Sequence, residues 1–138
     1  MEKQTMDSSD APTKEQYEEC AAVAHELNEF AALGKLDDLL PLEKDHSHLC
    51  NVGIWYCSLG HRMLASMAYK RSIELHPEAA TYFNLAVCQD DLGNPEGARQ
   101  SMEEFYKLVP TETERVQAEE MMRRHGKDHL IRPEAAGG

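Results

Sequence analysis

The sequence predicts an all-α protein built from repeated helix pairs, and three observations support this fold class. Apolar residues recur at the i, i+3, i+4 spacing of a helix face along most of the chain. The pattern repeats after 33 residues, so that Gly60 is matched by Gly93 and Pro77 by Pro110. The length of 138 residues suits one compact domain or a short solenoid. We therefore expect a solenoid over residues 12–126, in which stacked pairs bury a continuous core.

The N-terminal region predicts a helix pair with little repeat character. Residues 1–11 are polar, and we expect them to form a disordered acidic terminus. Thr13 then begins a capping-box sequence, which predicts a helix that ends near Gly34. The apolar face of this helix comprises Tyr17, Cys20, Ala21, Ala24 and Leu27. A second helix follows, which Pro41 must bend or shorten, so residues 12–44 are expected to form a degenerate pair.

Two clear repeats span residues 46–78 and 79–110. In each repeat the first helix is expected to end at a glycine, Gly60 or Gly93, and the second helix to end before a proline. Asn94 is a favoured N-cap and precedes a proline, which suits the first position of a helix. Small residues recur at Gly53, Ala65, Ala86 and Ala98. We expect these positions to let the two helices of each repeat approach closely.

A capping helix is expected over residues 111–126. Thr111 begins a second capping-box sequence, and the helix that follows is charged. Its sparse apolar side comprises Val116, Ala118, Met121 and Met122. A solenoid needs such a helix to cover its last apolar face. We expect this helix to end near Gly126 and residues 127–138 to form a flexible tail.

The order of large, small, glycine, aromatic and proline positions in both repeats resembles the tetratricopeptide repeat. The matching residues of the second repeat are Asn84, Leu85, Ala86, Gly93, Asn94, Pro95, Ala98, Phe105 and Pro110. Those of the first are Gly53, Tyr56, Gly60, Ala65, Tyr69 and Pro77. The resemblance implies a right-handed superhelix of helix pairs. It also implies a concave groove, lined mainly by the first helix of each pair, that holds a segment of another protein.

The groove positions implied by this resemblance form a mixed surface. They are Cys50, Asn51, Ile54, Cys57, Phe83, Asn84, Val87, Asp90 and Asp91. The apolar members offer pockets, the two amides suit a peptide backbone, and the two aspartates favour a basic residue. The expected partner is therefore an apolar or amphipathic protein segment with a basic flank. The alternative for each residue is packing against a neighbouring helix.

A weaker resemblance concerns the chaperones of type III secretion, which hold translocator proteins before export. The chain is similarly short and acidic, and Cys88-Gln89-x-x-Leu92-x-x-Pro95-x-x-Ala98 is similar to the last repeat of these chaperones. We therefore expect a protein-interaction module that acts as an adaptor or as a chaperone. Its N-terminal helix is also a candidate surface for a homodimer, which periodicity does not distinguish from a monomer.

The net charge excludes two classes of partner. The chain has 14 Lys and Arg against 25 Asp and Glu, which gives a net charge of −11. Duplex nucleic acid requires a basic face, and an anionic membrane surface repels an acidic chain. The longest uncharged stretch, residues 46–61, is too short and polar to span a bilayer. The polar start and the absence of C-x-x-C spacing lead us to expect reduced cysteines and a cytoplasmic protein.

A metal-binding or redox function is the alternative from another class. It depends on the cluster of His46, His48 and Cys50, because imidazole and thiolate suit zinc. On a helix, His46 and Cys50 share a face with Asp45 near its edge, but a closed zinc site needs a further ligand. We therefore expect no metal and no other cofactor. The sequence contains no Gly-rich phosphate loop, G-x-S-x-G or H-E-x-x-H motif, so no enzyme activity is expected, and Trp55 is assigned to the helix-packing core.

Overall fold

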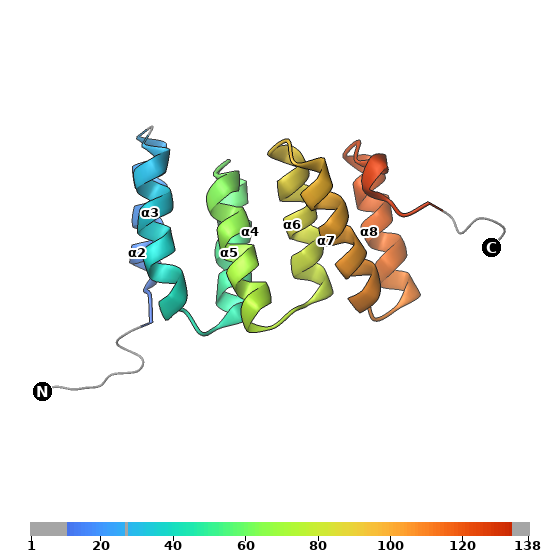
Figure 1. The fold of residues 1–138 in the computed structure, drawn as a ribbon, viewed down its shortest axis with the longest axis horizontal. Coiled ribbons are helices and arrows are strands. Elements are labelled where there is room, and N and C mark those ends of the chain that lie inside the picture. The colour runs from blue at the N-terminus through green and yellow to red at the C-terminus, as the bar shows by residue number, and fades with distance from the viewer. Residues whose placement is uncertain (1–10, 27, 134–138) are drawn as a thin grey trace, which may run out of the picture. The chain divides into compact units, whose positions relative to one another are not determined.

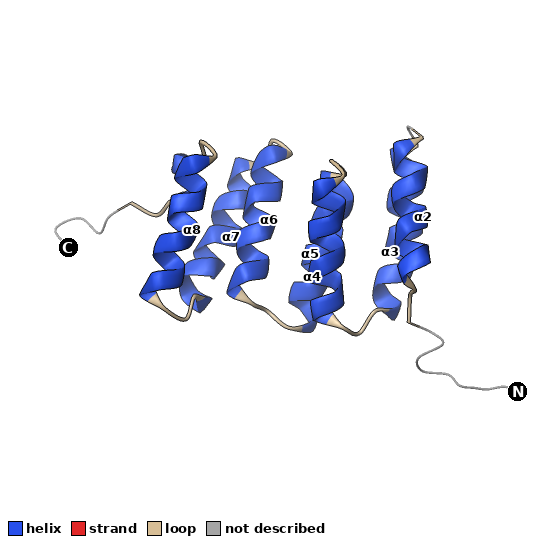
Figure 2. Ribbon diagram, turned by 180° about the vertical axis from the view of Figure 1, so that it is seen from behind, coloured by secondary structure: helices blue, strands red, loops and turns tan. Residues whose placement is uncertain are grey.

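The computed structural model describes residues 11–26 and 28–133. Within these ranges the ordered elements are all helices, as Figure 2 shows, and the all-α class is confirmed. The expectations for residues 1–10, for Leu27 and for residues 134–138 lie outside the described residues. The chain divides into two compact units, Met1–His76 and Pro77–Gly138. None of the helices in the described part is long and apolar enough to cross a membrane.

The first unit consists of two packed helix pairs (Figure 1). Its elements are α2 (Lys14–His25), α3 (Glu29–Leu39), the short 3-10 helix η2 (Leu40–Leu42), α4 (His46–Ser58) and α5 (Arg62–Leu75). Helices α2 and α3 pack as one pair, α4 and α5 as the other, and α3 also contacts α5. The core is built from large side chains that are fully or almost fully buried: Tyr17, Leu36, Leu49, Tyr56, Leu64 and Tyr69.

The second unit consists of one helix pair followed by a single helix. Its elements are α6 (Ala79–Asp91), α7 (Pro95–Leu108), α8 (Glu112–Arg124) and the 3-10 helix η3 (Asp128–Leu130). Helices α6 and α7 form the pair, and η3 contacts both α7 and α8. The core of this unit comprises Ala86, Ala98, Met102, Phe105, Met122 and Leu130.

The first helix pair differs from the sequence-based expectation in the position of its turn. Helix α2 ends at His25, and Asn28 begins α3 by accepting a hydrogen bond from the Ala31 N–H at 3.3 Å. The expected helix end near Gly34 is therefore wrong, because this glycine lies within α3. An Asn N-cap satisfies an otherwise unpaired N–H group of the first turn, which favours a helix start there. Pro41 ends α3 at Leu39 and lies in η2.

The glycines that end the first helices confirm the 33-residue period. Gly60, Gly93 and Gly126 have φ values of 86°, 82° and 71°, which an L side chain rarely adopts. After each glycine, the next N–H donates to a carbonyl one turn back in the helix, at 2.8 to 2.9 Å. This geometry is that of a Schellman motif. Helices α4, α6 and α8 therefore end in the same way, and each begins 33 residues after the one before.

By its position in the sequence, helix α8 therefore corresponds to the first helix of a third repeat. The second helices of the two clear repeats begin at Arg62 and Pro95, and η3 begins 33 residues later at Asp128. Residues 127–138 are expected to form a flexible tail, but within the described part of this segment η3 packs against α7 and α8. Leu130 is only 3% exposed in the core there. The burial of this apolar side chain explains why the segment is folded.

Gly53 illustrates why small residues recur between the helices of a repeat. A Cβ atom built on Gly53 would lie 2.5 Å from the Tyr69 ring on α5. Tyr69 is itself 2% exposed, so the ring has little room to move away. The glycine therefore sets the close approach of α4 to α5 that the sequence pattern predicts.

Candidate protein-binding surface

The predicted groove residues of the first unit lie on one helix, α4. Ile54 is 48% exposed and Asn51 is also exposed, whereas Cys50 and Cys57 are half-buried. An exposed isoleucine beside an exposed amide offers an apolar contact and a backbone hydrogen bond to a bound segment.

The predicted apolar groove residues of the second unit lie on α6 and are less accessible. Phe83 and Val87 are half-buried, and both pack against the core of this unit. The ring centroids of Phe83 and Phe105 are 5.8 Å apart. Asn84 is also half-buried. Part of the apolar surface expected in the groove therefore contributes to the folding of this unit.

The predicted acidic pair at the end of α6 binds basic groups of its own chain. The Lys127 ammonium lies 2.8 Å from the Asp90 carboxylate and 2.6 Å from that of Asp91. His129 Nε2 lies 2.8 Å from the other Asp90 oxygen. Burial alone would raise the pKa of Asp90, but the hydrogen bonds from Lys127 and His129 outweigh burial and lower it. The basic flank expected from a partner is thus supplied here by the segment after α8.

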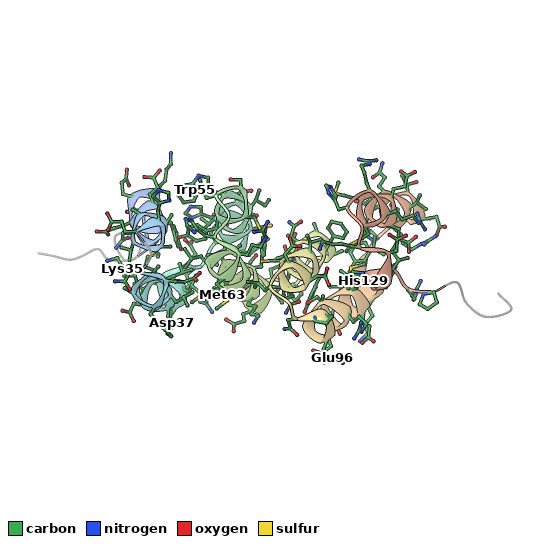
Figure 3. All side chains as sticks on the ribbon, turned by 90° about the horizontal axis from the view of Figure 1, so that it is seen from above. Lys35, Asp37, Trp55, Met63, Glu96 and His129 are labelled. Atoms are coloured by element: carbon green, nitrogen blue, oxygen red, sulfur yellow. The ribbon has the colours of Figure 1, made fainter. Side chains whose placement is uncertain are left out.

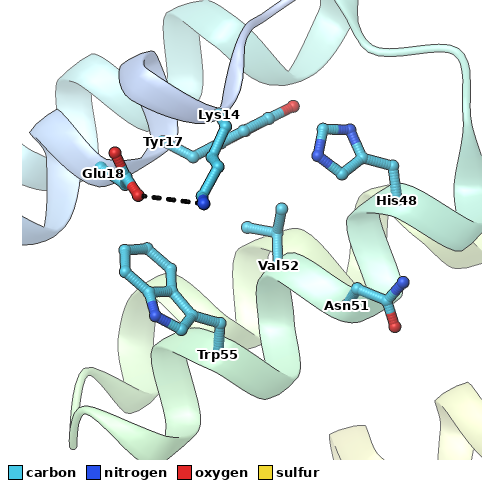
Figure 4. Close-up of a pocket in the computed structure, with 7 residues that line it drawn as sticks. All are labelled: Lys14, Tyr17, Glu18, His48, Asn51, Val52 and Trp55. Carbon is cyan, nitrogen blue, oxygen red and sulfur yellow. Dashed lines mark ion pairs between the residues drawn. The ribbon is translucent and has the colours of Figure 1, made fainter.

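A hollow of about 330 Å³ lies between α2 and α4 in the first unit, and we call it the α2–α4 hollow (Figure 4). It is lined by Lys14, Tyr17, Glu18, His48, Asn51, Val52 and Trp55. Asn51 was among the predicted groove residues and the other six were not. The sequence indicates part of this arrangement. Lys14 and Glu18 are four residues apart and so share a helix face, and the same is true of Asn51 and Trp55.

Trp55 is a lining residue of this hollow rather than a core residue. Its surface is 36% exposed, so the sequence-based assignment to the core is wrong. Figure 3 shows Trp55 on the α4 side of the second helix pair and Met63 on the α5 side. The position follows from the helical period, because the buried Val52 and Tyr56 already fill the face of α4 that meets the core.

A buried hydrogen-bond network fixes the back of the hollow. Glu43 is 3% exposed, and its carboxylate accepts hydrogen bonds from the Tyr17 hydroxyl at 2.7 Å and from the Asp45 N–H at 3.1 Å. His48 Nδ1 lies 3.1 Å from the same carboxylate. Burial, then the hydrogen bond to Glu43, raise the pKa of Tyr17, which keeps this hydroxyl protonated as a donor. The network therefore holds the imidazole in one orientation at the edge of the hollow.

The residues of the metal alternative point in different directions. His48 contacts Glu43, whereas the ring of His46 lies 4.6 Å from that of His76. Residues two apart on a helix differ by about 200° in direction, which separates these two imidazoles. Within residues 11–26 and 28–133, His46, His48 and Cys50 do not converge as one ligand set.

No protein-family model matches this chain, and no curated protein sequence matches it significantly. The resemblance to tetratricopeptide repeats therefore depends on the residues of the sequence themselves.

Proposed function

We propose that the protein binds a segment of another protein on the exposed faces of its first helices, as an adaptor or a chaperone. The observation that carries this proposal is the α2–α4 hollow, which the exposed Trp55 lines, and the exposed Ile54 precedes Trp55 on the same helix. A partially exposed tryptophan at the edge of a preformed hollow is typical of a residue that anchors a partner.

The chemistry of the first unit suits a partly apolar segment. Fully burying an isoleucine-sized side chain contributes about 1.5–3 kcal/mol, and Ile54 and Trp55 are both available for such burial. The exposed amide of Asn51 lies on the same helix and is able to bond the backbone of the segment. We therefore assign more of the recognition to the first unit than to Phe83 and Val87.

The proposal includes the repeat architecture and the location that the sequence resemblance implies. The helix pairs form a right-handed tetratricopeptide-like superhelix, and the last repeat is similar to that of the type III secretion chaperones. The protein acts in the cytoplasm and does not bind nucleic acid or membranes. A homodimer through the N-terminal pair is a second proposal, and the 91% exposure of Phe30 on α3 favours it.

Affinity purification of the tagged full chain from its native cell tests the proposed function. The co-purifying protein is identified, produced and titrated against the wild-type chain and against the variants Ile54→Ala and Met63→Ala. Met63 is a matched control, because it is 40% exposed on α5, a second helix. We expect Ile54→Ala to weaken binding by about fivefold or more and Met63→Ala to leave it unchanged, with equal helical circular dichroism.

The identity of the partner separates the two modes of action. A secreted protein favours the export chaperone, and a cytoskeletal or heat-shock protein favours the adaptor. Equal affinities of all three chains for the partner contradict the assignment of the binding face.

A further inference from the structure

The α2–α4 hollow combines aromatic surfaces with acidic and polar groups. Trp55 lines one side of the hollow, and the ring of Tyr17 lines another (Figure 4). The Glu18 carboxylate lines the same hollow, and its side chain is 44% exposed. An aromatic face beside a carboxylate attracts a cation that is carried on an apolar stem.

Lys14 already places one basic group of this chain over the hollow. Its ammonium lies 3.8 Å from the Glu18 carboxylate, in the space between Glu18 and Val52 (Figure 4). The Lys14 side chain is 81% exposed, and such i, i+4 pairs contribute only about 0.3–0.5 kcal/mol. A more strongly held cation is therefore able to displace it at small cost.

His48 adds an imidazole to the same wall. Its Nδ1 faces the buried Glu43 carboxylate at 3.1 Å, and this acceptor favours a proton on Nδ1. The other ring nitrogen, Nε2, faces the hollow in Figure 4. The lining thus offers the carboxylate of Glu18 and the imidazole of His48 to a donor-rich group.

We propose that the α2–α4 hollow binds an arginine side chain of the partner segment. This inference rests on the proposed function, because it names the side chain that anchors the bound segment. The guanidinium stacks on the indole of Trp55 and donates to the Glu18 carboxylate in place of the Lys14 ammonium. Arginine fits better than lysine, because its planar group stacks on aromatic rings and presents five donors in a fixed geometry.

The fluorescence of Trp55 tests the proposal directly, because the chain contains a single tryptophan. The full chain is titrated with the blocked peptide Ac-Leu-Ala-Arg-Ala-Leu-NH2 and with versions that carry citrulline, lysine or glutamate in place of arginine. We expect a saturable change with the arginine peptide and about fivefold weaker binding of the citrulline peptide. No binding of the arginine peptide, equal binding of the citrulline peptide or tighter binding of the glutamate peptide overturns the proposal.

Variants on α2 separate a specific contact from general charge attraction. Glu18→Gln should weaken binding of the arginine peptide by about fivefold, and Lys14→Ala should strengthen it by about twofold. Glu19→Gln is the matched control, because Glu19 lies outside the lining, with its carboxylate 3.9 Å from Lys35. Equal weakening by both glutamate variants overturns the proposal.

Failure of this inference is distinguishable from failure of the proposed function. If arginine dependence is absent but partner binding still depends on Ile54, the inference is wrong and the proposed function stands. If partner binding is independent of Ile54, the proposed binding face is wrong whatever the peptides show.

Discussion

Lys127 lies within 2.8 Å of Asp90, although 37 residues separate them in the chain. The contact joins the segment after α8 to the end of α6, within the second unit. Both side chains are largely buried, with 12% and 13% of their surfaces exposed. Asp91 and His129 complete the cluster at 2.6 and 2.8 Å. The acidic pair therefore holds Lys127 and His129 in place, which reduces its availability to a partner.

Lys127→Ala should lower the free energy of unfolding by about 1–3 kcal/mol, because it leaves the largely buried Asp90 carboxylate without its main cation. Urea unfolding followed by circular dichroism measures the change. Lys107→Ala is the matched control, since its pair with Glu104 is exposed to solvent. Similar losses for both lysine variants would contradict a special role for the Asp90 contact.

The same cluster predicts a pH dependence of stability. The pKa of folded Asp90 lies below the ordinary value of 3.8, so the unfolded chain binds this proton more tightly. The contribution of Asp90 is therefore complete above the unfolded pKa and is lost as the pH falls below about 4 toward the folded pKa. Asp90→Asn should reduce the slope of unfolding free energy against pH between about pH 5 and pH 2. An unchanged slope in this acidic range would show that the pair does not contribute.

Two glycines within helices should respond to alanine in opposite ways. Gly53→Ala should destabilise the protein by about 1–3 kcal/mol, because the new Cβ meets the buried Tyr69 ring at 2.5 Å. Gly34→Ala should stabilise it by about 0.5–1 kcal/mol, because its new Cβ meets no other part of the protein within 4 Å beyond its own helix turn and alanine favours a helix. Thermal unfolding measures both variants. A gain in stability for Gly53→Ala would show that Tyr69 moves more easily than its burial indicates.

Phe30→Ser tests the proposed homodimer. Phe30 is 91% exposed on α3, and a dimer interface through this helix would bury it. We expect sedimentation velocity to show that the serine variant is more monomeric than the wild type at equal concentration. Leu42→Ser, at a residue 46% exposed on η2, is the control. A wild-type chain that is monomeric at all concentrations would refute the homodimer.

The local features of this fold were predictable because they depend on residues close together in the chain. The N-caps at Thr13, Asn94 and Thr111 each accept the expected backbone N–H. Gly60 and Gly93 end their helices with a positive φ, as the repeat predicts. Cap and turn chemistry act within one helical turn, and a single sequence contains all the residues involved.

The candidate site was less predictable, because its residues come from separate elements. Asn51 was expected in a groove, but Lys14 and Glu18 reach the same hollow from α2. The end of the first helix is predicted near Gly34, because glycine is a common helix terminator. In the structure Gly34 lies within α3 instead.

The sequence alone therefore determined the helical class, the 33-residue period and most helix ends, since propensity, capping and glycine conformation act locally. Only the tertiary structure decided that Trp55 lines a hollow and that Lys127 binds Asp90. Both outcomes depend on which helix faces meet when apolar surface is buried, and on which charges this packing brings together. Such contacts join residues that are far apart in the chain.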